Sequence, residues 1–212
     1  AGEGTPVRLP FVGEYGIMPV VSLPEPGRSS QLVYVRSFED GNIWRIETSA
    51  VGAPPSLAPR VAIASTRVEE MPQLSPDGRR VTFTSDRTGN WEIWVSDPNG
   101  QNAVALTTMG AVAAGFPHWS PNGEEIVFHS NLESQWDVYA VSASGGKPRR
   151  LTSHPPSDGS PSYSRNGEWT YFSSNRATPR EQTIWKVPVA GGEAVQVTPS
   201  AGYAAQEAPD GA

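Results

Sequence analysis

The chain alternates short runs of apolar and aromatic residues with glycine-containing turns, and this alternation repeats along its length. Turn glycines at Gly78, Gly123, Gly167 and Gly211 lie 45, 44 and 44 residues apart. Each of the first three precedes, by five residues, a phenylalanine within a run of strand-forming residues. A period of roughly 40–50 residues built from short strands is typical of four-stranded propeller blades rather than of helical repeats. The pattern therefore predicts an all-β propeller with four-stranded antiparallel blades.

Four strands, named A to D in chain order, can be placed in each clear repeat. We predict them near residues 71–75, 80–85, 91–96 and 103–107, with equivalents near 116–120, 125–130, 136–141 and 149–152. The Asp-Gly and Asn-Gly pairs between strands A and B are typical of two-residue type I′ hairpins, in which both central residues have positive φ. Strands B and C carry apolar residues on both faces, which indicates that each sheet lies between two neighbours. Helix should be almost absent.

The repeats divide the 212 residues into four complete blades and the ends of a fifth. The blades are expected at about 18–65, 71–107, 116–152 and 160–198, with partial terminal strands at 5–9 and 204–211. The whole chain is thus predicted to be one propeller domain, or a fragment of a parent with six to eight blades. Because an open arc leaves apolar blade faces uncovered, we expect self-association through the end blades.

Composition narrows the function classes. The net charge of −6 argues against direct nucleic-acid binding by this segment, because such surfaces are basic. The chain has no cysteine, which leaves a periplasmic or a cytoplasmic bacterial location equally open. No apolar run approaches the roughly 20 residues of a membrane span, so membrane insertion is not expected. The sequence begins without Met, and we expect a processed chain or an excised piece.

Candidate chemistry is sparse. The chain contains no Gly-x-Ser-x-Gly nucleophile elbow, and His118, His129 and His154 lack the spacing of a metal site. The Asp86–Asn90 segment resembles the start of a calcium loop but lacks the later glutamate. We therefore predict no enzymatic activity, no metal and no cofactor.

The repeated motif resembles a known family. It consists of Ser-Pro-Asp-Gly at 75–78, an aromatic five residues later, Ser-Asp-Arg-x-Gly-Asn at 85–90, an aromatic strand, Gly-Gly and Leu-Thr. This order is similar to the repeats of TolB-type, WD-like β-propellers and extends over about residues 5–211. The ending at 191–198 is most similar to the C-terminal propellers of bacterial winged-helix regulators. Arg165 replaces the motif proline, and Leu132 replaces the motif arginine.

The resemblance implies a non-catalytic binding or sensing module, with a protein partner or a small ligand at the mouth of the central channel. Two alternatives stay open: an accessory propeller that gates substrate access to a serine peptidase domain, and a structural spacer. In an up-and-down blade, the B–C and D–A connections emerge on one face, where binding residues are expected. The candidates are Glu39, Asp40, Arg87, Asn90, Glu133, Gln135, Arg176 and Arg180 in B–C loops, and Glu70, Phe116, Asp158 and Tyr203 in D–A connections.

Overall fold

The computed structural model describes residues 16–21, 32–36, 41–47, 56–110, 113–155 and 157–207, and the chain divides into two units, 1–39 and 40–212. Strands and connections account for all of these described residues, and none of them is helical. In the first unit, β1 (Gly16–Val21) pairs antiparallel with β2 (Leu32–Arg36). The prediction of an all-β fold is confirmed.

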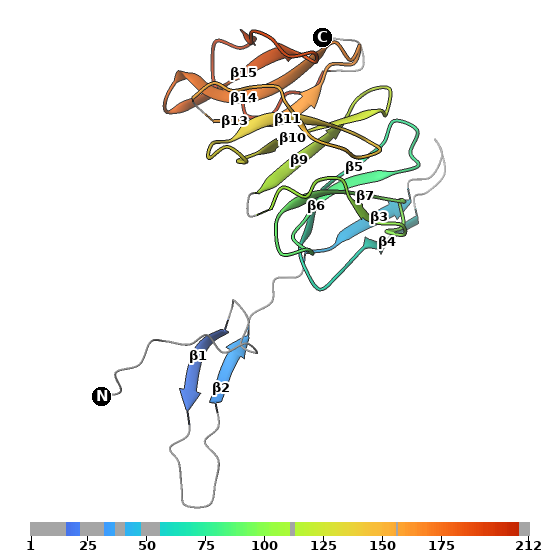
Figure 1. Cartoon of the computed structure of the whole chain (residues 1–212). Coiled ribbons are helices and arrows are strands. Elements are labelled where there is room, and N and C mark those ends of the chain that lie inside the picture. Colours follow the sequence, from blue (N-terminus) through green and yellow to red (C-terminus); the bar gives the residue numbers. More distant parts are fainter. Residues whose placement is uncertain are drawn as a thin grey trace, which may run out of the picture. The chain divides into compact units, whose positions relative to one another are not determined.

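The second unit contains three four-stranded antiparallel sheets, which we call the second, third and fourth blades (Figure 1). The second blade is β5 (Glu69–Leu74), β6 (Val81–Ser85), β7 (Glu92–Ser96) and β8 (Val104–Ala105). The third is β9 (Ala114–Trp119), β10 (Glu125–Ser130), β11 (Asp137–Ser142) and β12 (Arg149–Arg150). The fourth is β13 (Asp158–Tyr163), β14 (Trp169–Thr178), β15 (Glu181–Pro188) and β16 (Val195–Gln196).

These strands lie within a few residues of the predicted positions, and each sheet pairs its strands in chain order. In the same unit, β3 (Ile43–Glu47) pairs with β4 (Ser56–Ile63). Whether β1 to β4 together form the predicted blade at 18–65 stays a prediction. Residues 5–9 and 208–211 lie outside the described residues, and residues 201–207 form no strand.

The A–B turns differ from the expected two-residue hairpin. Gly78 has a φ of +68°, but Asp77 is not among the residues with positive φ. The Gly78 N–H donates to the Ser75 carbonyl at 2.8 Å, and the Ser75 N–H donates to the Arg80 carbonyl at 2.8 Å. Pro76 fixes φ near −65°, which suits the second position of a type I turn and excludes type I′ there. The glycine then supplies the one left-handed residue that the connection needs.

Side-chain hydroxyls satisfy backbone groups at both ends of each blade. Ser75, Ser120 and Ser164 each accept a hydrogen bond, through Oγ, from the N–H five residues later at 2.9 Å. At the end of strand D, Thr107 and Thr152 accept from the N–H groups of Ile93 and Val138 at 2.9 and 3.0 Å. Buried backbone groups beside the short strands therefore keep partners.

The core consists of layers between neighbouring sheets. Alternate residues of the third blade face opposite neighbours: Phe128 and Tyr139 pack with Ile93 of the second blade, whereas Val127 packs with Phe172 of the fourth. The phenylalanines five residues after each turn glycine, Phe83, Phe128 and Phe172, are fully buried. The third sheet is thus apolar on both faces because a neighbouring sheet covers each of them.

A buried acid–arginine pair ties the chain just after the last serine of strand B to the start of strand A in two of the three blades; Arg87 lies in the B–C loop, whereas Arg176, predicted in that loop, lies within β14. In the fourth blade, Asp158 is fully buried, and its Oδ2 lies 2.6 Å from a guanidinium nitrogen of Arg176. In the second blade, Glu69 and Arg87 form the equivalent pair at 3.0 Å. Both arginines also lie over aromatic rings within their blades.

The third blade replaces both members of this pair at once. Strand register aligns Ala114 with the two acids, because each of the three residues pairs with the last serine of strand B. Leu132 stands where the arginines stand, two residues after that serine. The Leu132 departure from the motif is therefore explained: without a buried carboxylate, an arginine there would have no ion-pair partner.

This substitution provides a matched test of the pair. Arg176→Leu alone leaves the buried Asp158 carboxylate without its cation and should lower the free energy of unfolding by about 3–5 kcal/mol. The double variant Asp158→Ala, Arg176→Leu copies the third blade and should recover most of that loss. Urea unfolding of the parent and both variants measures the difference. A double variant no more stable than the single one would contradict this account.

Candidate functional site

The innermost strand of each blade carries the same irregularity. Met71, Phe116 and Ser160 have φ values of +54°, +54° and +48°, although none is glycine. Each precedes a proline, and the pairing of strands A and B shifts register at these points. Proline has no N–H for the ladder, and a residue before proline ordinarily stays extended. Each of the three bulges therefore stores strain, on the order of 1–3 kcal/mol per residue.

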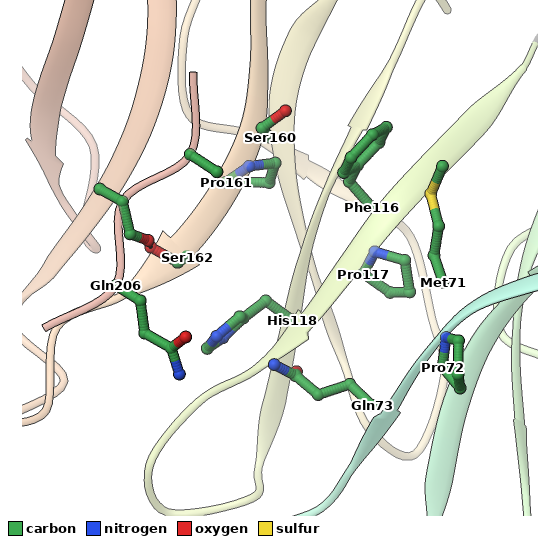
Figure 2. Close-up of a pocket in the computed structure, with 12 residues that line it drawn as sticks. Met71, Pro72, Gln73, Phe116, Pro117, His118, Ser160, Pro161, Ser162 and Gln206 are labelled. Carbon is green, nitrogen blue, oxygen red and sulfur yellow. Dashed lines mark hydrogen bonds between the residues drawn. The ribbon is translucent and has the colours of Figure 1, made fainter. Parts of the chain in front are cut away.

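These bulges line a shared pocket at the centre of the blades. The pocket measures about 380 Å³, and four successive inner segments each contribute three residues to it. The lining consists of Met71, Pro72 and Gln73; Phe116, Pro117 and His118; Ser160, Pro161 and Ser162; and Ala204, Ala205 and Gln206 (Figure 2). We call it the axial pocket.

The axial pocket has an apolar level and a polar level. Met71 and Phe116 lie together at one level, and the side chains of Gln73 and Gln206 turn toward His118 from either side at the other (Figure 2). None of the described lining residues is acidic or basic apart from His118. Burial lowers the pKa of His118, although its Nδ1 contact with the Trp119 carbonyl, at 3.0 Å, works in the opposite direction. The pocket wall is therefore uncharged near neutral pH.

The polar level is fixed by bonds between adjacent inner segments. Gln73 Oε1 accepts from the Trp119 N–H at 2.6 Å, and the Trp119 indole N–H donates to the Gln73 carbonyl at 3.1 Å. Ser162 Oγ donates to the Ala205 carbonyl at 2.6 Å. These bonds within the chain hold the lining in place.

His129 supports the bulges from behind. Its ring lies 4.8 Å from that of Phe116, and its Nδ1 accepts from the Ser160 N–H at 3.4 Å. A Cβ on Gly159 would lie 2.9 Å from that Nδ1. The backbone of β13 therefore approaches the His129 ring so closely that a larger residue at position 159 would require the ring to shift. Burial lowers the pKa of His129 to about 4. The imidazole is therefore neutral at physiological pH.

The predicted loop residues fall into three groups. Phe116 lines the axial pocket. The ring of Tyr203 packs against the ring of Phe116, with the ring centroids 6.4 Å apart. Arg87, Arg176 and Asp158 are engaged in the ion pairs within blades, and Glu133 pairs with Arg150. Gln135 donates to the His154 carbonyl. Glu70, which lies in β5 rather than in a connection, and Asn90 are half-buried, and Arg180 is exposed. Glu39 and Asp40 lie outside the described residues. The proposal that these loops bind a partner stays a prediction.

Sequence reasoning missed most of the axial lining. Gln73, His118, Ser162 and Gln206 occupy equivalent positions, but no charge or catalytic motif marks them. A signal was present in the repeat itself, because the proline after each bulge recurs at Pro72, Pro117 and Pro161, 45 and 44 residues apart. A proline near the middle of a predicted strand indicates a bulge.

Among the described residues, no cluster of three or more His, Asp or Glu side chains has a geometry that could hold a metal ion. The described part of the chain also contains no helix of the length and hydrophobicity that crossing a membrane requires.

The fold and the axial pocket define a β-propeller repeat protein. Its repeats match the family described as the TolB beta propeller domain over residues 61–212, more than two thirds of the chain. The chain therefore belongs to the TolB beta propeller domain family.

Solved structures share this fold. A protein assigned as TolB from Agrobacterium tumefaciens is 22% identical, with a TM-score of 0.66, and the likeness covers 86% of this chain and 62% of that one. TolB from Acinetobacter baumannii is 19% identical with a TM-score of 0.57, over 68% of this chain and 36% of that one. A puromycin hydrolase is 15% identical with a TM-score of 0.56, over 66% and 23%. The chain thus spans less than two thirds of the length of these proteins, and the likeness shows the fold alone.

The buried His129 predicts a pH-dependent stability. An unfolded histidine has a pKa near 6.5, whereas burial lowers the pKa of His129 in the folded chain to about 4. Between these values the unfolded chain binds more protons, so the free energy of unfolding falls as the pH drops from about 6.5 toward 4. His118 acts in the same direction.

Chemical unfolding from pH 7 to pH 4 measures this effect. The parent should lose up to about 3 kcal/mol more than His129→Gln over that range. His154→Gln, at an exposed position, should follow the parent. If the profile of His129→Gln runs parallel to that of the parent, His129 does not remain neutral because of burial.

Proposed function

We propose that this propeller is a non-catalytic binding module that holds an uncharged segment of a partner polypeptide in the axial pocket. The observation that carries the proposal is the strained bulge repeated in three inner strands. Strain of this kind persists where the surrounding structure enforces it, and it is concentrated at binding and active sites. Here it places Met71, Phe116 and Ser160 at the pocket.

The chemistry of the lining supports a polypeptide ligand. Met71, Phe116 and the three prolines offer an apolar surface, while Gln73, His118 and Gln206 offer donors and acceptors. Methionine and aromatic side chains adapt to apolar groups of varied shape. Amide and imidazole groups suit a backbone that presents N–H and C=O groups without charge. A volume of about 380 Å³ is that of a small ligand site, which fits one loop tip or chain end rather than a whole domain.

The absence of charge among the described lining residues favours an uncharged segment over an acidic or basic one. A charged group that enters a buried pocket loses its hydration and needs a partner there. The axial lining offers none near neutral pH. The pattern at 191–198, similar to the C-terminal propellers of bacterial winged-helix regulators, supports the further proposal that the propeller is the sensing part of such a regulator. A gating role beside a peptidase domain remains the alternative proposal, and the sequence of the full reading frame would separate the two.

Panning a phage-displayed library of random peptides against the 212-residue chain tests the proposal. Enriched peptides should be poor in charged residues, and their binding should depend on the axial lining. Gln206 is exposed but lines the pocket, so Gln206→Lys places an ammonium group beside the bound segment and should weaken binding severalfold, because contact with an uncharged segment removes part of the hydration of that charge.

Gln196→Lys is the matched control. It makes the same change at an exposed glutamine on the outer strand β16 and should leave peptide binding as in the parent. Equal losses in the two variants would point to a general charge effect. Enrichment of peptides that bind Gln206→Lys as tightly as the parent would contradict the proposed role of the axial pocket.

A further inference from the structure

A second, smaller cavity lies beside the axial pocket, between the third and fourth blades. It measures about 140 Å³ and shares Ser160 with the axial pocket. We call it the lateral pocket, and its lining consists of His129, Trp136, Ser157, Asp158, Gly159, Ser160, Ser173, Gln182 and Tyr203. Its volume is enough for a few water molecules or for one polar group on a short alkyl chain.

Three oxygen atoms of this lining are buried without a hydrogen-bond partner. They are Asp158 Oδ1, Ser160 Oγ and Gln182 Oε1. Asp158 is fully buried and Ser160 is 5% exposed. The other carboxylate oxygen of Asp158 is bound by Arg176, so the arginine does not satisfy Oδ1. Buried polar atoms ordinarily have partners, and three acceptors around one cavity indicate a donor that binds there.

Charge and aromatic groups around the cavity favour a cation. Arg176 offsets Asp158, while Arg150 lies against both Asp137 and Glu133, which leaves one negative charge in excess among these five groups. Asp137 is close enough to Asp158 for the two charges to interact. Burial keeps His129 neutral near pH 7, so it does not repel a cation. Trp136 and Tyr203 add aromatic faces, which attract cations.

The equivalent position between the second and third blades has no carboxylate. Ala114 stands where Asp158 stands, and Thr84 stands where His129 stands. The repeat alone therefore does not require a carboxylate at this position. The acceptor set belongs to the interface of the third and fourth blades.

We propose that the lateral pocket binds a primary ammonium group. Its three N–H donors match the three free acceptors, Asp158 Oδ1, Ser160 Oγ and Gln182 Oε1. The ammonium belongs either to a free alkylamine or to a lysine side chain of a bound polypeptide. This inference does not depend on the peptide role proposed for the axial pocket, because Ser160 is the only one of the three acceptors that also lines that pocket.

Binding of an ammonium group is measured by NMR at pH 7. The histidines of the chain are isotopically labelled, and their imidazole Cε1–H resonances are followed during titration. Titration with n-propylammonium chloride, at constant ionic strength, should shift the His129 resonance in a saturable way and leave that of the exposed His154 unchanged. Tetramethylammonium chloride carries the same charge without N–H donors and should produce no saturable shift. Acetyl-Gly-Lys-Gly-amide separates the sources: saturation by this peptide identifies a lysine side chain, and saturation by propylammonium alone identifies a free amine.

Gln182→Met removes one acceptor without touching the Asp158–Arg176 pair and should weaken propylammonium binding about 5- to 10-fold. Gln206→Met, which alters only the axial pocket, should bind as the parent does. The proposal is overturned if the His129 resonance shows no saturable shift up to about 100 mM propylammonium. It is equally overturned if tetramethylammonium acts like propylammonium, or if Gln182→Met binds as the parent does. Ordered water would then be the occupant.

Discussion

Burial of the sheet faces against neighbouring sheets is the constraint on which the structure of the second unit depends. Phe128 and Tyr139 of the third blade face the second blade, and Val127 faces the fourth. No blade can complete its core alone, so the sheets stack through their faces. This leaves the strand ends and the innermost edges as the places where polar and strained groups can be accommodated. The candidate sites lie at those places.

The innermost strands show how the stacked sheets support a binding surface. A left-handed residue before proline is unfavourable by itself, yet it recurs at Met71, Phe116 and Ser160. The neighbouring segments hold it there through bonds such as that between Gln73 and Trp119, and through the ring of His129. The bulges in turn give the axial pocket its lining. The strain is local, whereas the packing that offsets it extends across blades.

The sequence predicted the strands well because their signals are local. Turn glycines, the phenylalanines that follow them and strand-forming runs are read within a few residues, and they recur in register. The turn type was wrong because the turn begins at Ser75 and places Gly78 in its fourth position, rather than placing Asp77 and Gly78 at its centre, and the fourth blade forms the same turn without the proline. The roles of Arg87 and Arg176 were not readable in this way, since each binds a carboxylate 18 residues earlier in the chain. The paired change to Ala114 and Leu132 becomes meaningful only once strand register aligns the two positions.

Hydrogen–deuterium exchange on a complex of the chain with its tightest selected peptide tests the central claim most directly, namely that the axial pocket is the binding site. The account predicts slower exchange at the non-proline amides of residues 71–73, 116–118, 160–162 and 204–206, with little change at the outer strands β8, β12 and β16. Protection confined to the outer strands or to the loops around Asn90 and Arg180, with the axial segments unchanged, would contradict it.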